Sequence, residues 1–532
     1  MKPTRKGRVP SPWMLWVAGL LLVGCSQTPH LASLPASQSA TGDWVAAWGS
    51  AQLAQSPTVA AASAPAAILP MRDVTLRQVL RVTAEGVALR VRVSNLFGAE
   101  PLQIGSATVA RIQSVAVAPT PAQQAVLQAD TLRALTFGGQ RGLTVAPGAE
   151  VWSDAVELAV PRLGDLAVQV HVVAGSSPAT VHPGSRINSW AVAGNRVDAA
   201  VWADPRPREG WWYLAAVDVR ADPATTSEQP VLVATGDSIT DGYGVPSGSN
   251  QRWTDTLARR MVDAGRAASV VNTGIGGGRL LRDGQGPRLI SRFDRDVLDR
   301  TGVTHAVVLI GVNDLGVSHR ERATTPESRA GLLAEMKAGF TALADRAHAR
   351  GVCLIVATVL PYGGSGFYKP QPENEVDRVA LNEWIRQPGR FDAVLDFDAL
   401  LRDPARPTHL RADLDNDGLH PSLAGYRAMA DAFPLDVLAR RCGSAARIAA
   451  ATWRQHAGRL AAAQWADKPQ QNHAAVRQAR WASSIPCRPK TSASSPTPMV
   501  PSRCPAWRAC RSAATSPARS STRRSCLHTT RA

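Results

Sequence analysis

Between Pro230 and Cys442, short apolar runs alternate with amphipathic segments of helical period, and this pattern constrains the fold more than any other. Five runs show almost no polar alternation, as expected of strands buried on both faces: PVLVATG, ASVVN, HAVVLIG, VCLIVAT and AVLDF. Between them lie the helix candidates Trp253–Ala264 and Pro326–Arg350. The pattern predicts an α/β domain at 230–442, with a doubly wound parallel sheet that binds ligands beyond the carboxyl ends of its strands.

A different pattern precedes this domain. From Trp44 to Asp222 the segments are short and alternate with period two, as in TLRQVLRVTAEGVALRVRVSN and LAVQVHVV. Turn signals such as Phe97-Gly98 and Pro147-Gly148 separate them, and segments of helical period are scarce. The pattern predicts an antiparallel, jelly-roll-like β-sandwich domain at 44–222.

The N-terminus has the form of an export signal. Basic residues up to Arg8 precede the apolar run WMLWVAGLLLVG, which is too short for a stable membrane span. The run ends in Leu-Val-Gly-Cys25, which resembles a bacterial lipobox, and Ser26 follows, as in lipoproteins of the Gram-negative outer membrane. We therefore expect a lipoprotein signal peptide at 1–25, lipidation of Cys25 and a Ser-, Ala- and Pro-rich tether at 26–43; the alternative is an ordinary signal peptide with an accidental cysteine.

The positive charge of the chain is concentrated at its ends. The net charge is +17, of which 443–532 carry +14 and the first 25 residues +4, so 26–442 are close to neutral at −1. A neutral body argues against nucleic acid as the main partner. After a possible helix at 445–466 the tail at 443–532 lacks periodicity and is expected to be disordered; a basic arm for acidic lipid or polysaccharide and a frame-shifted translation are the alternatives.

The seven cysteines show no spacing from which pairs can be assigned, and four of them fall in the basic tail. Neither CxxC nor HExxH occurs, so the sequence predicts no zinc site. No motif for a cofactor was found either.

Polar residues follow three of the predicted strands. The first strand leads directly into Gly-Asp-Ser238, which would expose Ser238 at its carboxyl end, although a serine there is more often a helix cap. A glycine turn that contains Gly277 follows the second strand, and Gly-Val-Asn313-Asp follows the third. An asparagine amide and backbone N–H groups can stabilise a developing oxyanion; the alternatives are a phosphate loop, whose patterns do not fit, and a simple turn residue.

The stretch DLDNDGLHP, from Asp413 to Pro421, has two interpretations. Its alternating acids and glycine resemble the start of a calcium loop, but position twelve is Ala424 where a bidentate Glu is needed. Asp417 and His420 are three residues apart, so one turn can place the carboxylate beside the imidazole. Pro421 keeps His420 extended and is expected to start the next helix. The other histidines lack such spacing and are expected to be structural or exposed.

Together these blocks resemble the SGNH or GDSL hydrolase superfamily, over about residues 230–435. The resemblance implies a flavodoxin-like sheet and a serine esterase, in which Ser238 attacks the ester carbonyl, His420 transfers the proton and Asp417 holds the imidazolium. It also implies an oxyanion hole of Ser238, Gly277 and Asn313. Here glycines flank Gly277 where the family commonly has polar residues, which leaves open which glycine donates. The upstream β-rich region is similar to a domain that precedes this one in some secreted bacterial members.

These features lead to the prediction of a lipid-anchored carboxylic ester hydrolase without metal or cofactor. It would be exported and attached to the outer membrane, on the periplasmic side or at the cell surface, or otherwise be secreted. It would act on small acyl esters, including acetyl groups on polysaccharide; lysophospholipids and thioesters are the alternative substrates. The alternative is a glycan-binding envelope lipoprotein in which the hydrolase fold is an inactive scaffold.

Overall fold

The computed structural model describes residues 44–55, 71–113, 125–222, 229–321 and 323–442. The predicted signal peptide with Cys25, the tether at 26–43 and the basic tail at 443–532 lie outside the described residues. Within the described ranges, no helix has both the length and the apolar composition needed to cross a bilayer.

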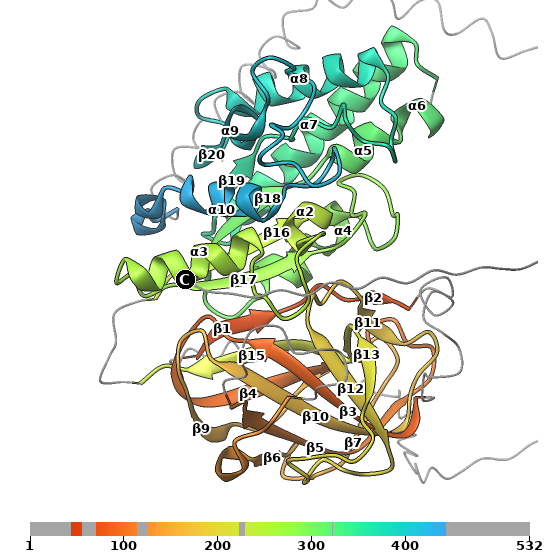
Figure 1. Cartoon of the computed structure of the whole chain (residues 1–532), viewed down its shortest axis with the longest axis vertical. Coiled ribbons are helices and arrows are strands. Elements are labelled where there is room, and N and C mark those ends of the chain that lie inside the picture. The colour runs from red at the N-terminus through yellow and green to blue at the C-terminus, as the bar shows by residue number, and fades with distance from the viewer. Residues whose placement is uncertain (1–43, 56–70, 114–124, 223–228, 322, 443–532) are drawn as a thin grey trace, which may run out of the picture. The chain divides into compact units, whose positions relative to one another are not determined.

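The first part of the chain is a largely antiparallel β-sandwich, as its period-two pattern predicts (Figure 1). One sheet has the strand order β1-β15-β4-β8, with β9 also paired to β4, and the other has the order β13-β12-β3-β10-β5-β6, with β7 also paired to β5. A small third sheet has the order β14-β11-β2. The strands are β1 (Trp44–Gly49), β2 (Leu53–Ala54), β3 (Arg72–Arg81), β4 (Gly86–Ser94), β5 (Leu102–Arg111), β6 (Arg133–Leu135), β7 (Leu143–Val145), β8 (Glu150–Trp152), β9 (Val156–Val160), β10 (Asp165–Ala174), β11 (Thr180–His182), β12 (Asn188–Ala193), β13 (Arg206–Glu209), β14 (Trp211–Trp212) and β15 (Leu214–Arg220).

The core of the sandwich lies between its two large sheets. Alternate residues of β4 and β15, such as Val91 and Val217, meet Leu76 of β3 and Val170 of β10, and all four are at most 3% exposed. A side chain of this size contributes about 1.5–3 kcal/mol when it is fully buried. The alternation seen in the sequence therefore corresponds to one apolar face per sheet.

The second part contains a parallel sheet with the strand order β17-β16-β18-β19-β20. Its strands are β16 (Val231–Gly236), β17 (Ser269–Gly274), β18 (Val303–Leu309), β19 (Cys353–Ala357) and β20 (Ala393–Leu395). All four pairings are parallel, and the order corresponds to the flavodoxin-like 2-1-3-4-5 arrangement. The five apolar runs therefore mark the five strands correctly, and the fold class is as predicted.

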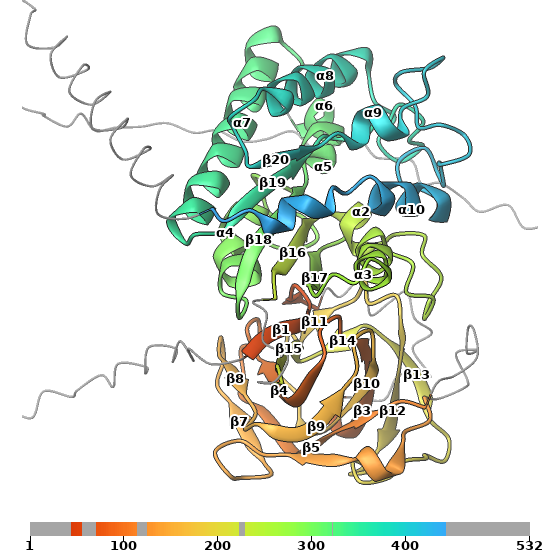
Figure 2. The same ribbon diagram turned by 90° about the vertical axis from the view of Figure 1, so that its left-hand side faces the viewer.

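Helices cover both faces of this sheet, with α3 and α10 on one side and α4 and α7 on the other (Figure 2). The helices α3 (Trp253–Asp263) and α7 (Pro326–Ala349) agree with the predicted segments to within one residue at each end. Thr325 caps α7 by accepting the Ser328 N–H, and Pro326 occupies the first helical position. The other helical segments of the described chain are η2 (Ala129–Thr131), α2 (Ser238–Asp241), α4 (Leu289–Phe293), η4 (Asp294–Leu298), α5 (Val312–Gly316), α6 (Ser318–Glu321), α8 (Pro372–Arg386), α9 (Phe397–Leu401), α10 (Leu423–Asp431) and η5 (Leu435–Ala439).

The carboxyl end of β16 is packed so closely that only glycine fits there. A Cβ atom on Gly236 would lie 2.1 Å from the Leu309 carbonyl oxygen of β18. Beneath this end the buried Arg292 donates hydrogen bonds to the carbonyl oxygens of Gly236 and Thr273, at 3.0 and 2.8 Å. Its charge is balanced by Asp296 at 3.0 Å. This packing fixes the ends of β16 and β17, from which the polar segments of the sequence emerge.

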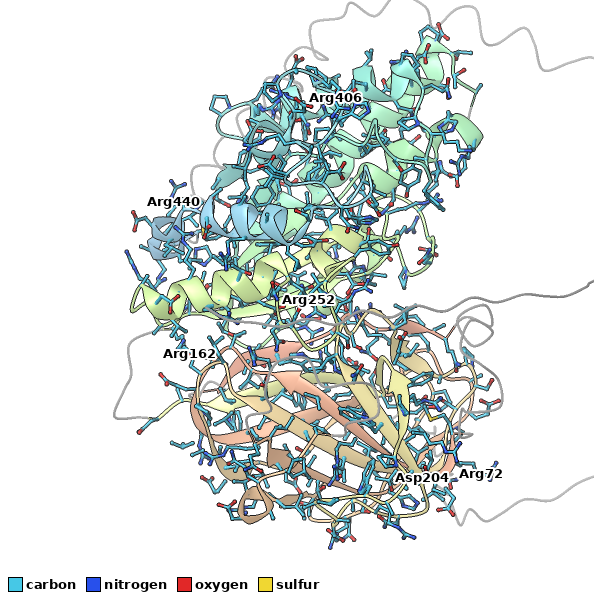
Figure 3. The ribbon with its side chains drawn as sticks, viewed as in Figure 1. Arg72, Arg162, Asp204, Arg252, Arg406 and Arg440 are labelled. Carbon is cyan, nitrogen blue, oxygen red and sulfur yellow. A yellow bond between two sulfur atoms is a disulfide. The ribbon has the colours of Figure 1, made fainter. Side chains whose placement is uncertain are left out.

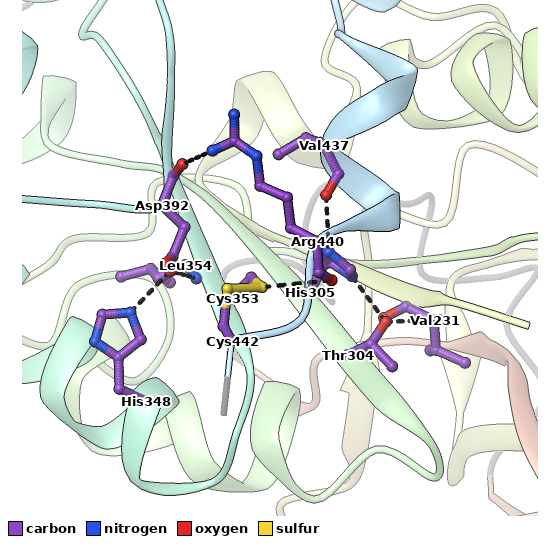
Figure 4. Close-up of a disulfide and its surroundings, with 10 residues drawn as sticks. All are labelled: Val231, Thr304, His305, His348, Cys353, Leu354, Asp392, Val437, Arg440 and Cys442. Atoms are coloured by element: carbon purple, nitrogen blue, oxygen red, sulfur yellow. Dashed lines mark hydrogen bonds and ion pairs between the residues drawn. A yellow bond between two sulfur atoms is a disulfide. The ribbon is translucent and has the colours of Figure 1, made fainter. Parts of the chain in front are cut away.

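A disulfide joins Cys353 at the start of β19 to Cys442, just after η5 (Figure 4). The sequence showed no basis for assigning this pair, because the two residues are 89 positions apart. The Asp392 carboxylate lies nearby and accepts hydrogen bonds from the Leu354 N–H at 2.7 Å and from the His348 ring at 2.8 Å. The bond therefore attaches the end of the described chain to β19, the neighbour of the edge strand β20.

Removal of this disulfide should destabilise the protein, because it releases a long loop in the unfolded state. We expect Cys442→Ser to lower the free energy of unfolding by about 2–4 kcal/mol, measured by urea denaturation. Treatment of the unmodified protein with dithiothreitol should give the same loss, and Cys442→Ser should show no further change with the reductant. An unfolding midpoint that reduction leaves unchanged would contradict the pairing.

Candidate active site

Ser238 occupies the first position of α2, directly after the central strand β16. Asp237 caps this short helix by accepting the Ile239 N–H at 3.0 Å, and Gly242 ends it in the left-handed conformation. Burial raises the pKa of Asp237 to about 7. The serine therefore projects from the carboxyl end of the sheet and is 8% exposed.

His420 contacts Ser238 although the two are 182 residues apart in sequence. Ser238 Oγ lies 2.8 Å from His420 Nε2, and His420 Nδ1 lies 2.9 Å from Asp417 Oδ2. Because an ionised carboxylate only accepts hydrogen bonds, Nδ1 carries the hydrogen of the neutral ring and Nε2 is left to accept the serine hydroxyl. The arrangement can remove a proton from Ser238 and hold the resulting imidazolium against Asp417.

A tight turn holds Asp417 beside His420. The N–H groups of Leu419 and His420 donate to Asp417 Oδ1 at 3.1 and 2.8 Å. Burial opposes the charge of Asp417, but these hydrogen bonds and the imidazole outweigh it, so the pKa of the carboxyl is below its usual range. Burial lowers the pKa of His420, and the neighbouring Asp417 only partly offsets this. The ground state therefore favours a neutral imidazole beside a carboxylate.

The residues around this turn correct one prediction. The helix α10 begins at Leu423 and is capped by Ser422, whose side chain accepts the Gly425 N–H, so Pro421 precedes the helix and does not start it. The capping serine accounts for the shift, because its oxygen satisfies a free N–H of the first turn.

The acidic residues that resembled a calcium loop make other contacts. Asp413 pairs with Arg411 at 2.8 Å. Asp415 Oδ1 accepts the N–H groups of Asp417 and Gly418 at 3.1 and 2.8 Å. Asp415 therefore braces the turn that presents Asp417.

Asn313 lies on the other side of the site, in α5. Its Nδ2 donates to the Gly278 carbonyl at 2.6 Å, which leaves one amide hydrogen for another acceptor. The Gly278 N–H donates a hydrogen bond to the Ile275 carbonyl oxygen at 2.9 Å. Among the described residues the N–H of Gly277 has no acceptor, and Gly277 has a φ of 69°, a conformation that favours glycine. Of the three glycines, Gly278 is therefore excluded as a free donor.

Asp314 connects the Asn313 segment to the glycine turn. Its carboxylate accepts the N–H groups of Leu280 and Leu281 at 2.8 and 3.1 Å. Burial raises the pKa of Asp314 to about 6. The structure thus brings Ser238, Gly277, Asn313, Asp417 and His420 to one edge of the sheet.

Two aromatic residues of the site were not identified from the sequence. The Tyr368 hydroxyl donates to Asn313 Oδ1, and burial raises the pKa of Tyr368, which keeps this proton in place. The Tyr243 ring stacks on His420, with centroids 4.1 Å apart and planes at 25°. Tyr368 lies 55 residues after Asn313, and no sequence spacing marks the pair. Tyr243 follows Ser238 closely in the sequence, and this proximity is the one signal that indicates its place at the site.

Residues 234–428 match the model of the GDSL-like Lipase/Acylhydrolase family. No curated protein matches the chain. Among solved structures, a lipolytic protein of the G-D-S-L family from Desulfitobacterium hafniense is 23% identical, with coverage of 38% of this chain and 97% of that one and a TM-score of 0.28. An acetylxylan esterase from Geobacillus stearothermophilus is 22% identical, with 40% and 96% covered and a TM-score of 0.30. A GDSL-like lipase from Bacteroides thetaiotaomicron is 18% identical, with 40% and 92% covered and a TM-score of 0.30.

The match to the family model begins within β16 and includes Ser238, the glycine turn, Asn313 and the Asp417–His420 turn, in that order along the chain. The chain therefore carries, at residues 234–428, a hydrolase domain of the GDSL-like Lipase/Acylhydrolase family, which acts on ester bonds.

Proposed function

We propose that the protein hydrolyses carboxylic esters with Ser238 as nucleophile, His420 as general base and acid, and Asp417 as the group that orients the imidazole. The observation that carries this proposal is the unbroken hydrogen-bond chain from Ser238 Oγ through His420 to Asp417. As Ser238 Oγ bonds to the ester carbon, its proton passes to His420 Nε2. The same proton then passes to the departing alcohol oxygen, and water repeats the sequence to release the acid.

The oxyanion of the tetrahedral intermediate would be bound by the remaining Asn313 amide hydrogen and the N–H groups of Gly277 and Ser238. Support comes from the fixed orientation of the Asn313 amide, which both Gly278 and Tyr368 hold. Donors that are oriented before the reaction stabilise the developing charge without reorganisation.

The proposed substrates are small acyl esters, including O-acetyl groups on polysaccharide. The low exposure of Ser238 supports a small acyl group, because little of the surroundings of the nucleophile is open to a long chain. We also propose that the protein is exported and anchored through lipid on Cys25. The Cys353–Cys442 disulfide supports export, since structural disulfides persist mainly in oxidising compartments.

Substitution of the nucleophile tests the central proposal. Ser238→Ala should lower the rate of p-nitrophenyl acetate hydrolysis by at least about a thousandfold. Ser291→Ala, a change of the same kind on the exposed surface of α4, should leave the rate unchanged. Equal rates for the native protein and Ser238→Ala would reject the serine mechanism and favour an inactive scaffold.

The pH dependence follows from the pKa of His420, which burial lowers. The base must be neutral to accept the serine proton, so kcat/KM should rise with pH through the pKa of His420 and level off above it. The midpoint of this rise should therefore lie below the ordinary histidine value of about 6.5. A pH profile of kcat/KM, with circular dichroism to confirm folding at each pH, measures it. A midpoint at pH 7 or above would contradict the geometry.

Tyr368 should act through Asn313. Tyr368→Phe removes one hydrogen bond and should lower kcat by about tenfold, with little change in KM, because the amide loses its preferred orientation. Asn313→Ala should cost about a hundred- to a thousandfold. In the Asn313→Ala background, Tyr368→Phe should have no further effect.

Tyr362→Phe is the matched control for this prediction. The ring of Tyr362 lies 6.1 Å from that of Tyr368, and its buried hydroxyl has no hydrogen-bond partner among the described residues. Its loss should leave kcat unchanged. Equal losses from Tyr368→Phe with and without Asn313 would show that Tyr368 acts by another route.

A further inference from the structure

The turn between β11 and β12 of the sandwich packs directly against the helix that carries the nucleophile. A Cβ atom on Gly184 of this turn would lie 2.1 Å from Asp241 Oδ2, at the end of α2. Next to it, His182 Nε2 lies 3.0 Å from Asp241 Oδ1, and both side chains are at most 5% exposed. From the sequence, His182 was expected to be structural or exposed. Its partner Asp241 could not be identified, because it lies 59 residues away.

The His182 ring is held at both nitrogens. Its Nδ1 lies 2.8 Å from the Ala51 carbonyl oxygen, which can only accept, so Nδ1 carries a hydrogen. Its Nε2 faces the Asp241 carboxylate, and a proton must therefore lie between these two groups as well. Such a buried, hydrogen-bonded pair fixes the position of the sandwich turn relative to α2.

Arg252, at the start of α3, forms a second connection between this turn and α2. Its guanidinium donates to the carbonyl oxygens of Asp241, at 2.9 Å, and of Ser185. Figure 3 shows Arg252 where α3 faces the sandwich. The backbone beyond Ser185 is therefore placed with little freedom.

This placement brings Arg186 of the sandwich to the active site. Its Cζ lies 5.5 Å from the centroid of the Tyr243 ring, the ring that stacks on His420. The backbone of Arg186 has a φ of 50°, which is unfavourable for a residue with a side chain, and the Gly248 N–H donates to its carbonyl at 2.8 Å. Local strain of this kind persists only where the surroundings impose it.

The charge of Arg186 is not neutralised nearby. No acidic side chain among the described residues forms an ion pair with it, and its buried Nε has no hydrogen-bond partner there. Tyr243 beside it is 44% exposed, so this side of the site is open to a ligand. The positive charge of Arg186 also acts on His420. Burial is the larger cause of the lowered pKa of His420, and the charge of Arg186 lowers this pKa further.

The position of these residues indicates which part of a substrate they meet. His420 gives its proton to the departing alcohol, so the groups packed on His420 lie on the alcohol side of the ester. Tyr243 offers the exposed part of its ring there, and Arg186 holds a cation over that ring. A guanidinium is the side chain best suited to bind a carboxylate through two parallel hydrogen bonds.

We propose that Arg186 and Tyr243 bind the alcohol portion of the substrate and that this alcohol carries a carboxylate, as in an O-acetylated uronic acid unit of a polysaccharide. The inference rests on the proposed ester hydrolysis and names its substrate class. It also assigns a role to the sandwich, which supplies one wall of the active site and is not a separate glycan-binding module.

The test compares two acetyl esters, the anion 4-acetoxybenzoate and its neutral methyl ester, with the full-length protein, and measures the release of acetate from each. Both place the substituent on the alcohol side. The native protein should prefer the anionic ester after correction for the reactivity of the two leaving groups with hydroxide. Arg186→Gln should lower the ratio of kcat/KM for the anionic ester over the neutral one by about tenfold or more. Arg186→Lys, which keeps the charge, should retain part of the preference.

Arg206→Gln provides the matched control, because Arg206 lies on β13 of the same domain and its side chain is 45% exposed. It should leave the ratio unchanged, and circular dichroism should show that all variants are folded. Acetate release from acetylated polygalacturonate and acetylated xylan then extends the comparison to glycans, with the first as the better substrate.

The two levels of the proposal fail in different ways. If the native protein and Ser238→Ala hydrolyse p-nitrophenyl acetate equally, the ester hydrolase mechanism is wrong. If Ser238 is required but Arg186→Gln changes the anionic-to-neutral ratio by less than twofold, or the native protein shows no preference for the anionic ester, the assignment of Arg186 is overturned.

Discussion

The active site depends on the register between β16 and its two neighbours. Gly236, the last residue of β16, is paired with Gly274 of β17 and with Leu309 of β18. Because all three strands are parallel, the segments that follow them start at one level, although they come from distant parts of the sequence. A slip of one residue would turn the alternate side chains of β16 to the opposite face and separate Ser238 from Asn313. The close contact of Gly236 with the Leu309 carbonyl makes such a slip costly.

Features that depend on short stretches of sequence could be predicted: the strands, two helices and the Asp417–His420 pair. Each parallel strand is a continuous apolar run, and α3 and α7 are segments of helical period, so both kinds of element were predicted from short windows. The Asp417–His420 pair was visible because a single turn creates it. Ser238 and Asn313 were found because polar residues follow buried strands at the edge where parallel sheets bind ligands.

Contacts between distant segments could not be predicted in this way. The Tyr368–Asn313 hydrogen bond, the His182–Asp241 pair and the Cys353–Cys442 disulfide join residues 55 to 89 positions apart, with no repeated spacing to mark them. The sequence also predicted two domains, because the change of period near residue 230 is sharp. The structure places buried polar contacts across that boundary, and these depend on three-dimensional packing alone.

The disulfide has a mechanical consequence for a chain that continues beyond residue 442. The loop that it closes contains α8, α9, α10 and the turn with Asp417 and His420. A pulling force on the chain after Cys442 passes through the sulfur–sulfur bond into β19. The bond therefore carries the load past the turn with Asp417 and His420, so that this turn is not stretched by a force on the chain after Cys442.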